Sequence, residues 1–185
     1  MTVLLIQWDA AYGYKPLGVG KFKCLELNER KKMSSIKKIM AAVDFSEYTA
    51  RIMDYAGRLA EDLGAELLFV NVINQRDVDM VKQVTFYTDS ISVKDYVNGL
   101  KQDRSERLQE LIKETRCNQI AHQFIIRTGV PFQELINAAA EEKADMVVMG
   151  TKGRGNIAGI LLGSQAEKMF RHCPVPLLSI REKED

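Results

Sequence analysis

The sequence has few of the residues that mark a secreted, disulfide-bonded or metal-binding protein. Its 185 residues include three cysteines and two histidines. Cys24, Cys117 and Cys173 lie far apart, form no C-x-x-C pair and have no histidine at metal-ligand spacing. Isolated thiols of this kind are typical of a reducing compartment, so we expect buried thiols rather than a disulfide or a zinc site.

Long apolar runs and an excess of charge are also missing. No apolar run approaches the length that a membrane span needs. The apolar start, Met1 to Ile6, has no basic region before it and is broken at once by Gln7, Trp8 and Asp9, which argues against a signal peptide. The formal net charge is +1, whereas a nucleic-acid partner usually needs a clustered basic face. The sequence therefore predicts a cytoplasmic protein with no nucleic-acid or membrane partner.

The chain divides near Met33 into an extension and a domain. Residues 1–34 contain one short apolar run, several glycines and the basic stretch Arg30-Lys31-Lys32, and they do not fit the pattern that follows. We interpret them as an N-terminal extension, which is either a functional or disordered arm or the product of a start codon set too far upstream. Residues 35–185 are predicted to form one domain.

From Ser35 onward, strand and helix patterns alternate with short connections, as in a parallel sheet covered by helices. Strands are predicted at residues 38–43, 66–72, 119–127, 145–149 and 174–180. Helices are predicted at 46–63, at 93–115, from Pro131 onward and at 164–171. Ser46 is expected to cap the first helix, whose inward face would carry Ile52, Tyr55, Leu59 and Leu63. Residues 74–92 show no clean period and are predicted to be a loop insertion.

The connections limit how these strands can be arranged. Right-handed crossovers leave few topologies, and we expect a five-stranded parallel sheet of order 3-2-1-4-5 with helices on both faces, a Rossmann-like α/β fold. In such sheets a ligand lies beyond the carboxyl ends of the strands, where the order reverses between the first and the fourth. This topology brings together three segments: Asp44 to Ser46, Val72 to Asn74, and Gly150 to Ser164.

The last of these segments carries the chemistry. From Met149 to Gln165 the sequence reads MGTKGRGNIAGILLGSQ. Its glycines let the backbone approach a ligand closely, and successive N–H groups in such a loop form an anion-binding concavity. Gly163 and Ser164 open the last helix, where unpaired N–H groups, the helix dipole and a hydroxyl favour a phosphate. Lys152 and Arg154 could add positive charge.

Three other interpretations of the loop fit the sequence less well. The glycines could serve only as turn residues, but six glycines or serines in one connection make this interpretation less favoured. Ile157, Ile160 and Leu161 have helical spacing, which predicts a short packed turn in the middle of the loop. The P-loop pattern G-x-x-x-x-G-K-[ST] is absent. Gly153 to Ala158 matches G-x-G-x-x-A by letters, but it follows the fourth strand and lacks an acidic partner for a ribose, so a dinucleotide site is disfavoured.

The spacing of the loop resembles a known family signature. Gly150-x-x-Gly153, nine further residues and then Gly163-Ser164 match the G-2x-G-9x-G-[ST] pattern of ATP-binding universal stress proteins. Shorter similarities support it, and the resemblance covers about residues 36–180. These supporting stretches are Ala42-Val43-Asp44-x-Ser46, Gly64-Ala65-Glu66-Leu67, Thr128-Gly129-x-Pro131, Ala144 to Thr151, and Cys173-Pro174-Val175-Pro176.

The resemblance implies a fold of the adenine nucleotide alpha hydrolase-like type and a homodimer paired through the last strand, Val175 to Ile180. It also implies ATP, with magnesium, whose adenosine lies near Asp44 and Val72 and whose phosphates lie on the glycine loop. Asp44 is a candidate for the ribose or for magnesium, with helix capping as its alternative role. The implied nucleotide contacts are Ala42, Asp44, Val72, Met149, Gly150, Gly153, Arg154, Gly163, Ser164 and Gln165.

The chain departs from the family pattern at two positions. Phe45 stands where a glycine often follows the aspartate, and Asn71 stands where a histidine is frequent. Both concern the nucleoside end of the site rather than the phosphate loop.

Two functions remain open at this stage. The first is an ATP-binding regulatory or stress-response protein that acts as a homodimer, with an unidentified protein partner. The alternative is a slow ATP-hydrolysing or adenylyl-transferring enzyme on the same site. No catalytic residue can be named, because no Ser-His-Asp set, carboxylate pair or metal cluster is found at known spacing.

Overall fold

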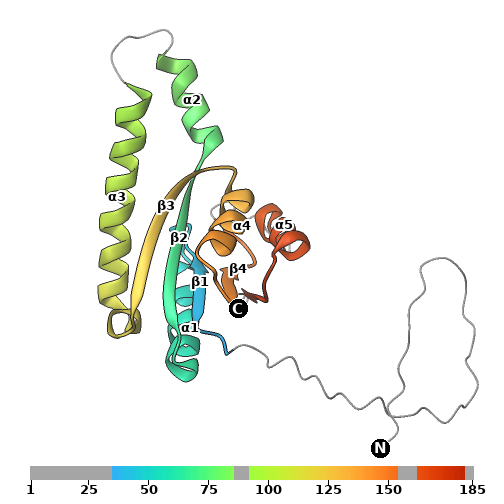
Figure 1. Cartoon of the computed structure of the whole chain (residues 1–185). Helices are drawn as coiled ribbons and strands as arrows, with labels where there is room; N and C mark the ends of the chain where they lie inside the picture. Colours follow the sequence, from blue (N-terminus) through green and yellow to red (C-terminus); the bar gives the residue numbers. More distant parts are fainter. Residues whose placement is uncertain (1–34, 86–91, 154–161, 182–185) are drawn as a thin grey trace, which may run out of the picture. The chain divides into compact units, whose positions relative to one another are not determined.

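A computed structural model describes residues 35–85, 92–153 and 162–181 of the chain (Figure 1). Within these residues, a parallel sheet of five strands has the order β3-β2-β1-β4-β5, which confirms the predicted topology. The strands are β1 (Lys38–Ala42), β2 (Glu66–Asn74), β3 (His122–Gly129), β4 (Met146–Gly150) and β5 (Leu177–Ile180).

Helices cover both faces of this sheet (Figure 1). One face packs against α1 and α3, and the other packs against α4 and α5. α2 continues directly from β2. The helices are α1 (Thr49–Leu63), α2 (Gln75–Thr85), α3 (Val93–Glu114), α4 (Pro131–Glu141) and α5 (Ser164–His172), with a 3₁₀ turn, η1, at Arg116–Gln119.

β1 and β2 are buried on both sides, because a parallel sheet between two helix layers has no solvent face. In β1, Ile39 and Ala41 face the α1 side while Met40 faces the α4 side. Phe69 of β2 is fully buried among the α1-side residues. This burial on both sides explains why the strands are continuous apolar runs in the sequence.

Asp145 joins the two strands between which the chain order reverses. Its carboxylate accepts hydrogen bonds from the backbone N–H groups of Lys37, at 2.8 Å, and Lys38, at 3.0 Å. Ile39 then pairs with Met146 in the parallel register of β1 and β4. This contact at the amino ends fixes the two strands side by side, and their carboxyl ends form the floor of the site described below.

The predicted loop at residues 74–92 is wrong in part, because residues 75–85 form α2. Val78 of this helix is 6% exposed, and Met80 is 59% exposed. The helix therefore buries one apolar side chain and leaves a nearby one in solvent. Over so short a stretch, the apolar residues show no clean helical period in the sequence. Residues 86–91 lie outside the described part of the chain.

Three smaller predictions also need correction. The inward face of α1 is confirmed only in part: Ile52 is buried and Leu59 packs against the core, but Tyr55 is 40% and Leu63 46% exposed. Met53, Ala56 and Ala60 are buried as well. The third strand begins later than predicted, since η1 occupies the residues before it. The last strand begins at Leu177 rather than at residue 174.

Other predictions fall outside what the structure describes or stay open. The packed turn at Ile157, Ile160 and Leu161 lies outside the described residues, and so does Cys24. That residues 1–34 form an extension to a domain at 35–185 stays a prediction. Within the described ranges, none of the helices is both long and apolar enough to cross a membrane.

Candidate functional site

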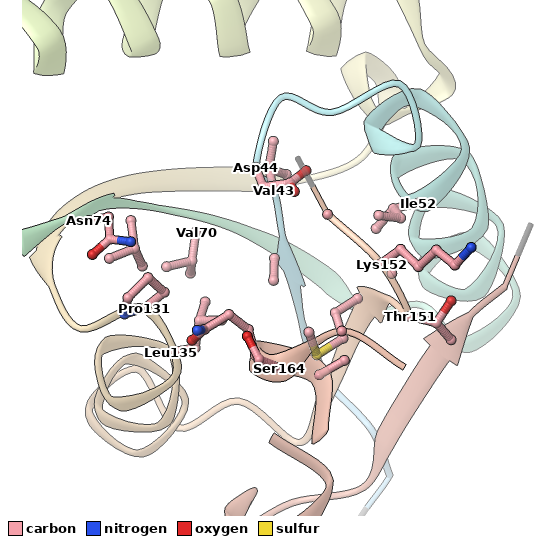
Figure 2. A pocket seen from close by; sticks show the side chains of 18 residues that line it. Val43, Asp44, Ile52, Val70, Asn74, Pro131, Leu135, Thr151, Lys152 and Ser164 are labelled. Carbon is pink, nitrogen blue, oxygen red and sulfur yellow. The ribbon is translucent and has the colours of Figure 1, made fainter. Parts of the chain in front are cut away.

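A pocket of about 300 Å³ opens at the carboxyl ends of β1, β2 and β4 (Figure 2). It lies where the strand order reverses, which is where a ligand is expected in an open α/β sheet. Its volume is at the lower end of the range for small-molecule sites. The lining residues are Ala42, Val43, Asp44, Ile52, Val70, Val72, Asn74, Pro131, Leu135, Met149, Gly150, Thr151, Lys152, Gly153, Gly163, Ser164, Gln165 and Ala166.

The two sides of the pocket differ in chemistry. Figure 2 shows Val70, Pro131 and Leu135 on one side, close to Asn74 at the rim. Asp44, Thr151 and Lys152 lie on the other side, with the apolar Ile52 behind them. The first side can accept a flat apolar group, and the second can accept a polar or charged one.

The N-terminus of α5 faces the pocket. Gly163 precedes the helix in an extended conformation, and no side chain caps the helix start. Ser164, Gln165 and Ala166 form its first turn and line the pocket. Backbone N–H groups in a first turn have no intrahelical acceptor, so these three are directed to whatever occupies this end.

Two contacts hold this helix start in place. The Gly163 N–H donates to the Thr151 carbonyl at 2.8 Å, which ties the end of the glycine loop to its beginning. The Gln165 side-chain carbonyl accepts from the Phe132 N–H at 3.1 Å. Since Phe132 lies in the first turn of α4, Gln165 joins the starts of α4 and α5 beside the pocket.

Asp44 closes the turn that follows β1. Its Oδ1 accepts from the Ser46 N–H at 3.0 Å, the Ser46 hydroxyl at 2.7 Å and the Thr49 hydroxyl at 3.4 Å. The predicted cap by Ser46 is therefore wrong: Tyr48 is the N-cap residue of α1 and makes no side-chain cap bond, because the Ser46 hydroxyl is used within the turn. Phe45, between Asp44 and Ser46, has a φ of 60°.

The other oxygen of Asp44 explains why residue 153 is a glycine. A Cβ atom at Gly153 would lie 2.5 Å from Asp44 Oδ2, a separation that real Cβ atoms do not show. The carboxylate thus lies directly over the backbone of the glycine loop. Because Oδ1 is held by three donors, the side chain cannot easily turn away.

All of the predicted nucleotide contacts except Arg154 line this one pocket. Arg154 lies outside the described residues. That the others bind a nucleotide stays a prediction. Sequence reasoning missed the wall formed by Pro131 and Leu135, although a helix that opens at the carboxyl end of the third strand was the signal that would have found it.

Protein side chains alone form no metal site in the part of the chain that the structure describes. Among the residues that the structure describes, no three or more His, Cys, Asp or Glu side chains gather closely enough to hold an ion. Asp44 as a magnesium ligand stays a prediction.

Comparisons with known proteins agree on one family. A sequence model of the Universal stress protein family matches residues 35–181. The universal stress protein MJ0577 of Methanocaldococcus jannaschii is 26% identical over 155 residues, which cover 80% of this chain and 96% of the relative. Its solved structure superposes with a TM-score of 0.69 at 24% identity, over 82% of this chain and 99% of that one.

Two further solved structures share the fold and contain a ligand. One is a universal stress protein in complex with cAMP, with a TM-score of 0.53 and 21% identity. The match covers 81% of this chain and 100% of the other. The second is the universal stress protein from Archaeoglobus fulgidus in complex with dAMP, with a TM-score of 0.54 and 17% identity over 79% and 98%.

The contact between Asp44 and Gly153 can be tested by stability measurements. Gly153→Ala should lower the free energy of unfolding by about 1–3 kcal/mol, as overpacking of a tight site does. In an Asp44→Ala background the same substitution should cost much less, because the oxygen that the new methyl group meets is gone. Urea denaturation of the two single variants and the double variant measures this difference.

Gly99→Ala is the matched control, since a Cβ atom at Gly99 of α3 would meet nothing within 4 Å. That variant should be as stable as the parent or gain up to about 1 kcal/mol from helix propensity. An equal cost of Gly153→Ala with and without the Asp44 carboxylate would contradict the contact.

Proposed function

The chain belongs to the universal stress protein family, and from this premise we propose that it is a cytoplasmic regulatory protein that binds ATP and acts as a homodimer. The observation that carries the proposal is the pocket, where an apolar wall and an uncapped helix N-terminus meet at the carboxyl ends of β1 and β4. Such a pocket suits a ligand with a flat apolar ring at one end and negative charge at the other.

The backbone at Val72 favours adenine as that ring. The Glu66 N–H donates to the Lys37 carbonyl at 2.8 Å, and the Val70 carbonyl accepts from the Val43 N–H at 2.9 Å. Even-numbered residues of β2 therefore direct their backbone groups toward β1. β1 ends at Ala42, so the N–H and C=O groups of Val72 point past its end into the crevice. A neighbouring donor and acceptor complement the ring nitrogen and the exocyclic amine of adenine.

The opposite side supplies groups for phosphates. The first-turn N–H groups of α5 and the Ser164 hydroxyl can donate to phosphate oxygens, and Lys152 adds positive charge at the rim. Magnesium bound to a nucleotide usually takes only one or two carboxylates besides phosphate oxygens and water. The single carboxylate of Asp44 is compatible with that role.

Three further observations support the proposal. Proteins of the same fold have been solved with cAMP and with dAMP, both adenine nucleotides. Cys117 and Cys173 are free thiols, as a reducing compartment requires. Among the described residues that line the pocket, Asp44 has the one carboxylate, and its Oδ1 accepts from three donors in the β1–α1 turn, so these residues include no evident general base. This favours a protein in which the bound nucleotide controls dimer formation or the binding of a partner. The alternative is an ATP-hydrolysing or adenylyl-transferring enzyme.

ATP binding should depend on the start of α5. Ser164→Ala should weaken ATP binding about fivefold, the effect of one hydrogen bond of about 1 kcal/mol. Gly163→Val should abolish measurable binding, because a side chain there would block the approach of a phosphate to the backbone. Titration calorimetry with ATP and magnesium gives both dissociation constants.

Thermal unfolding must accompany these titrations. A Cβ atom at Gly163 would lie 3.3 Å from the Thr151 carbonyl oxygen, so Gly163→Val can also disturb the loop. Ser105→Ala, which removes a hydroxyl that bonds within α3 to the Lys101 carbonyl, is the matched control and should bind ATP as the parent does. Unchanged affinity in both pocket variants would refute the phosphate assignment.

ATP turnover should be very slow. Phosphoryl transfer needs a positioned water or nucleophile and a group that orients it, and the lining residues that the structure describes provide no such pair. We expect hydrolysis several orders of magnitude below the enzyme median of about 10 per second. A single-turnover assay with excess protein and labelled ATP measures it. Turnover near one per second that is lost in Asp44→Ala, while ATP binding persists, would establish the enzyme instead.

The homodimer is proposed to form through residues 175–180. β5 is an edge strand with β4 as its partner in the sheet. The Pro176 carbonyl accepts from the N–H of Val147 in β4, and the Ile180 carbonyl accepts from the N–H of Thr151, just after β4. The backbone groups of Leu177 and Ser179 therefore point outward and are available to a second copy. Ser179→Pro removes one outward N–H without removing a bond to β4, and should give a folded monomer by light scattering and circular dichroism.

Leu178→Pro is the contrasting variant, because the Leu178 N–H is directed toward β4 and its loss should destabilise the fold itself. A dimer that survives Ser179→Pro, or a parent chain that is monomeric at micromolar concentration with and without ATP, would exclude pairing through β5.

A further inference from the structure

Two side chains bridge β1 and β2 at the point where these strands separate. Asn71 of β2 is 2% exposed, and its amide nitrogen donates to the Val43 carbonyl at 2.6 Å. Arg104 of α3 donates through Nη1 to the Asn71 side-chain oxygen at 2.7 Å and to the Val72 carbonyl at 3.2 Å. The three contacts form one chain from the end of β1, through α3, to Val72.

This bridge stands where the backbone ladder stops. The last backbone hydrogen bond between the two strands joins the Val43 N–H to the Val70 carbonyl. If the ladder continued, its next bond would join the Val72 N–H to the Val43 carbonyl. The turn at Phe45, with its φ of 60°, instead leads the chain away from β2. Side chains thus set the separation of Val43 and Val72, which both line the pocket. A guanidinium group suits this task because its donors have a fixed planar geometry.

A second arginine of α3 supports the same end of the pocket. The Arg107 guanidinium lies over the Phe45 ring, 4.9 Å from its centroid. Arg104 and Arg107 are three residues apart and so lie on one side of the helix. Their contacts reach the β1–α1 turn and the end of β2, whereas the phosphate end rests on β4 and α5.

We propose that Arg104, through Asn71 and the Val72 carbonyl, is a positioning residue that determines how well the site distinguishes adenine from other bases. The proposal rests on the proposed function, since it concerns the base end of the same nucleotide site. A carbonyl oxygen has two lone pairs, so the Val72 oxygen can accept from Arg104 and from the exocyclic amine of adenine at once. Arg104 holds that oxygen in the direction that the amine needs.

The test compares ATP with purine riboside 5′-triphosphate, which lacks only the exocyclic amine. The parent protein should bind ATP about five- to tenfold more tightly, the effect of one hydrogen bond. In Arg104→Gln this preference should fall to less than about twofold, while purine riboside triphosphate binds nearly as in the parent. Arg104→Lys, which keeps the charge but not the geometry, should lose part of the preference. Titration calorimetry with magnesium supplies the dissociation constants.

Lys101→Gln is the matched control, because Lys101 is an exposed residue of the same helix and the substitution removes a positive charge close to Arg104 in sequence. It should leave the ATP preference as in the parent, and thermal unfolding should show that each variant is folded. A purely structural or long-range electrostatic role of Arg104 would weaken both nucleotides equally and leave their ratio unchanged.

The outcomes separate this inference from the proposed function. Absence of ATP binding in the parent chain would refute the function itself. ATP binding without any preference over purine riboside triphosphate, or a preference that Arg104→Gln leaves intact, would refute the role of Arg104 alone. If Arg104→Gln does not fold, an intact preference in Arg104→Lys has the same meaning.

Discussion

The turn that Asp44 closes is the constraint on which the site depends. Because Oδ1 accepts from the Ser46 N–H and hydroxyl, the chain leaves the sheet at the end of β1 while β2 continues to Asn74. That difference in length exposes the backbone of Val72 on the side where its ladder partner would have been. The same carboxylate lies over Gly153, so one side chain sets the position of the base end and of the glycine loop together.

The pocket's two ends follow from different kinds of structure. Its apolar wall is formed by side chains that also pack in the core, such as Val72 of β2 and Leu135 of α4. The polar end uses backbone N–H groups at the start of α5, which need only glycines and a helix terminus. Backbone donors can bind a phosphate without supplying a proton acceptor, and for this reason we propose binding rather than turnover at this site.

The sequence predicted the features that are local, and it missed those that depend on distant contacts. Most strands and the helix start at Ser164 were predictable, because apolar runs and a helix start are each written in a few consecutive residues. The rule for right-handed crossovers then limited the possible strand orders. α2 was missed because the burial of Val78 depends on tertiary packing rather than on a long period. The bond between Asn71 and Arg104 joins residues 33 positions apart and has no local pattern.

The two residues that depart from the family pattern are both contacted by α3. Phe45, in place of a frequent glycine, adopts a positive φ that costs a non-glycine residue on the order of 1 kcal/mol, and its ring is covered by Arg107. Asn71, in place of a frequent histidine, accepts from Arg104. Each unusual residue of the base end is thus contacted by an arginine on one helix. The departures and α3 therefore form one support behind the pocket, and variation at any of these positions is expected to act on base selection before it acts on phosphate binding.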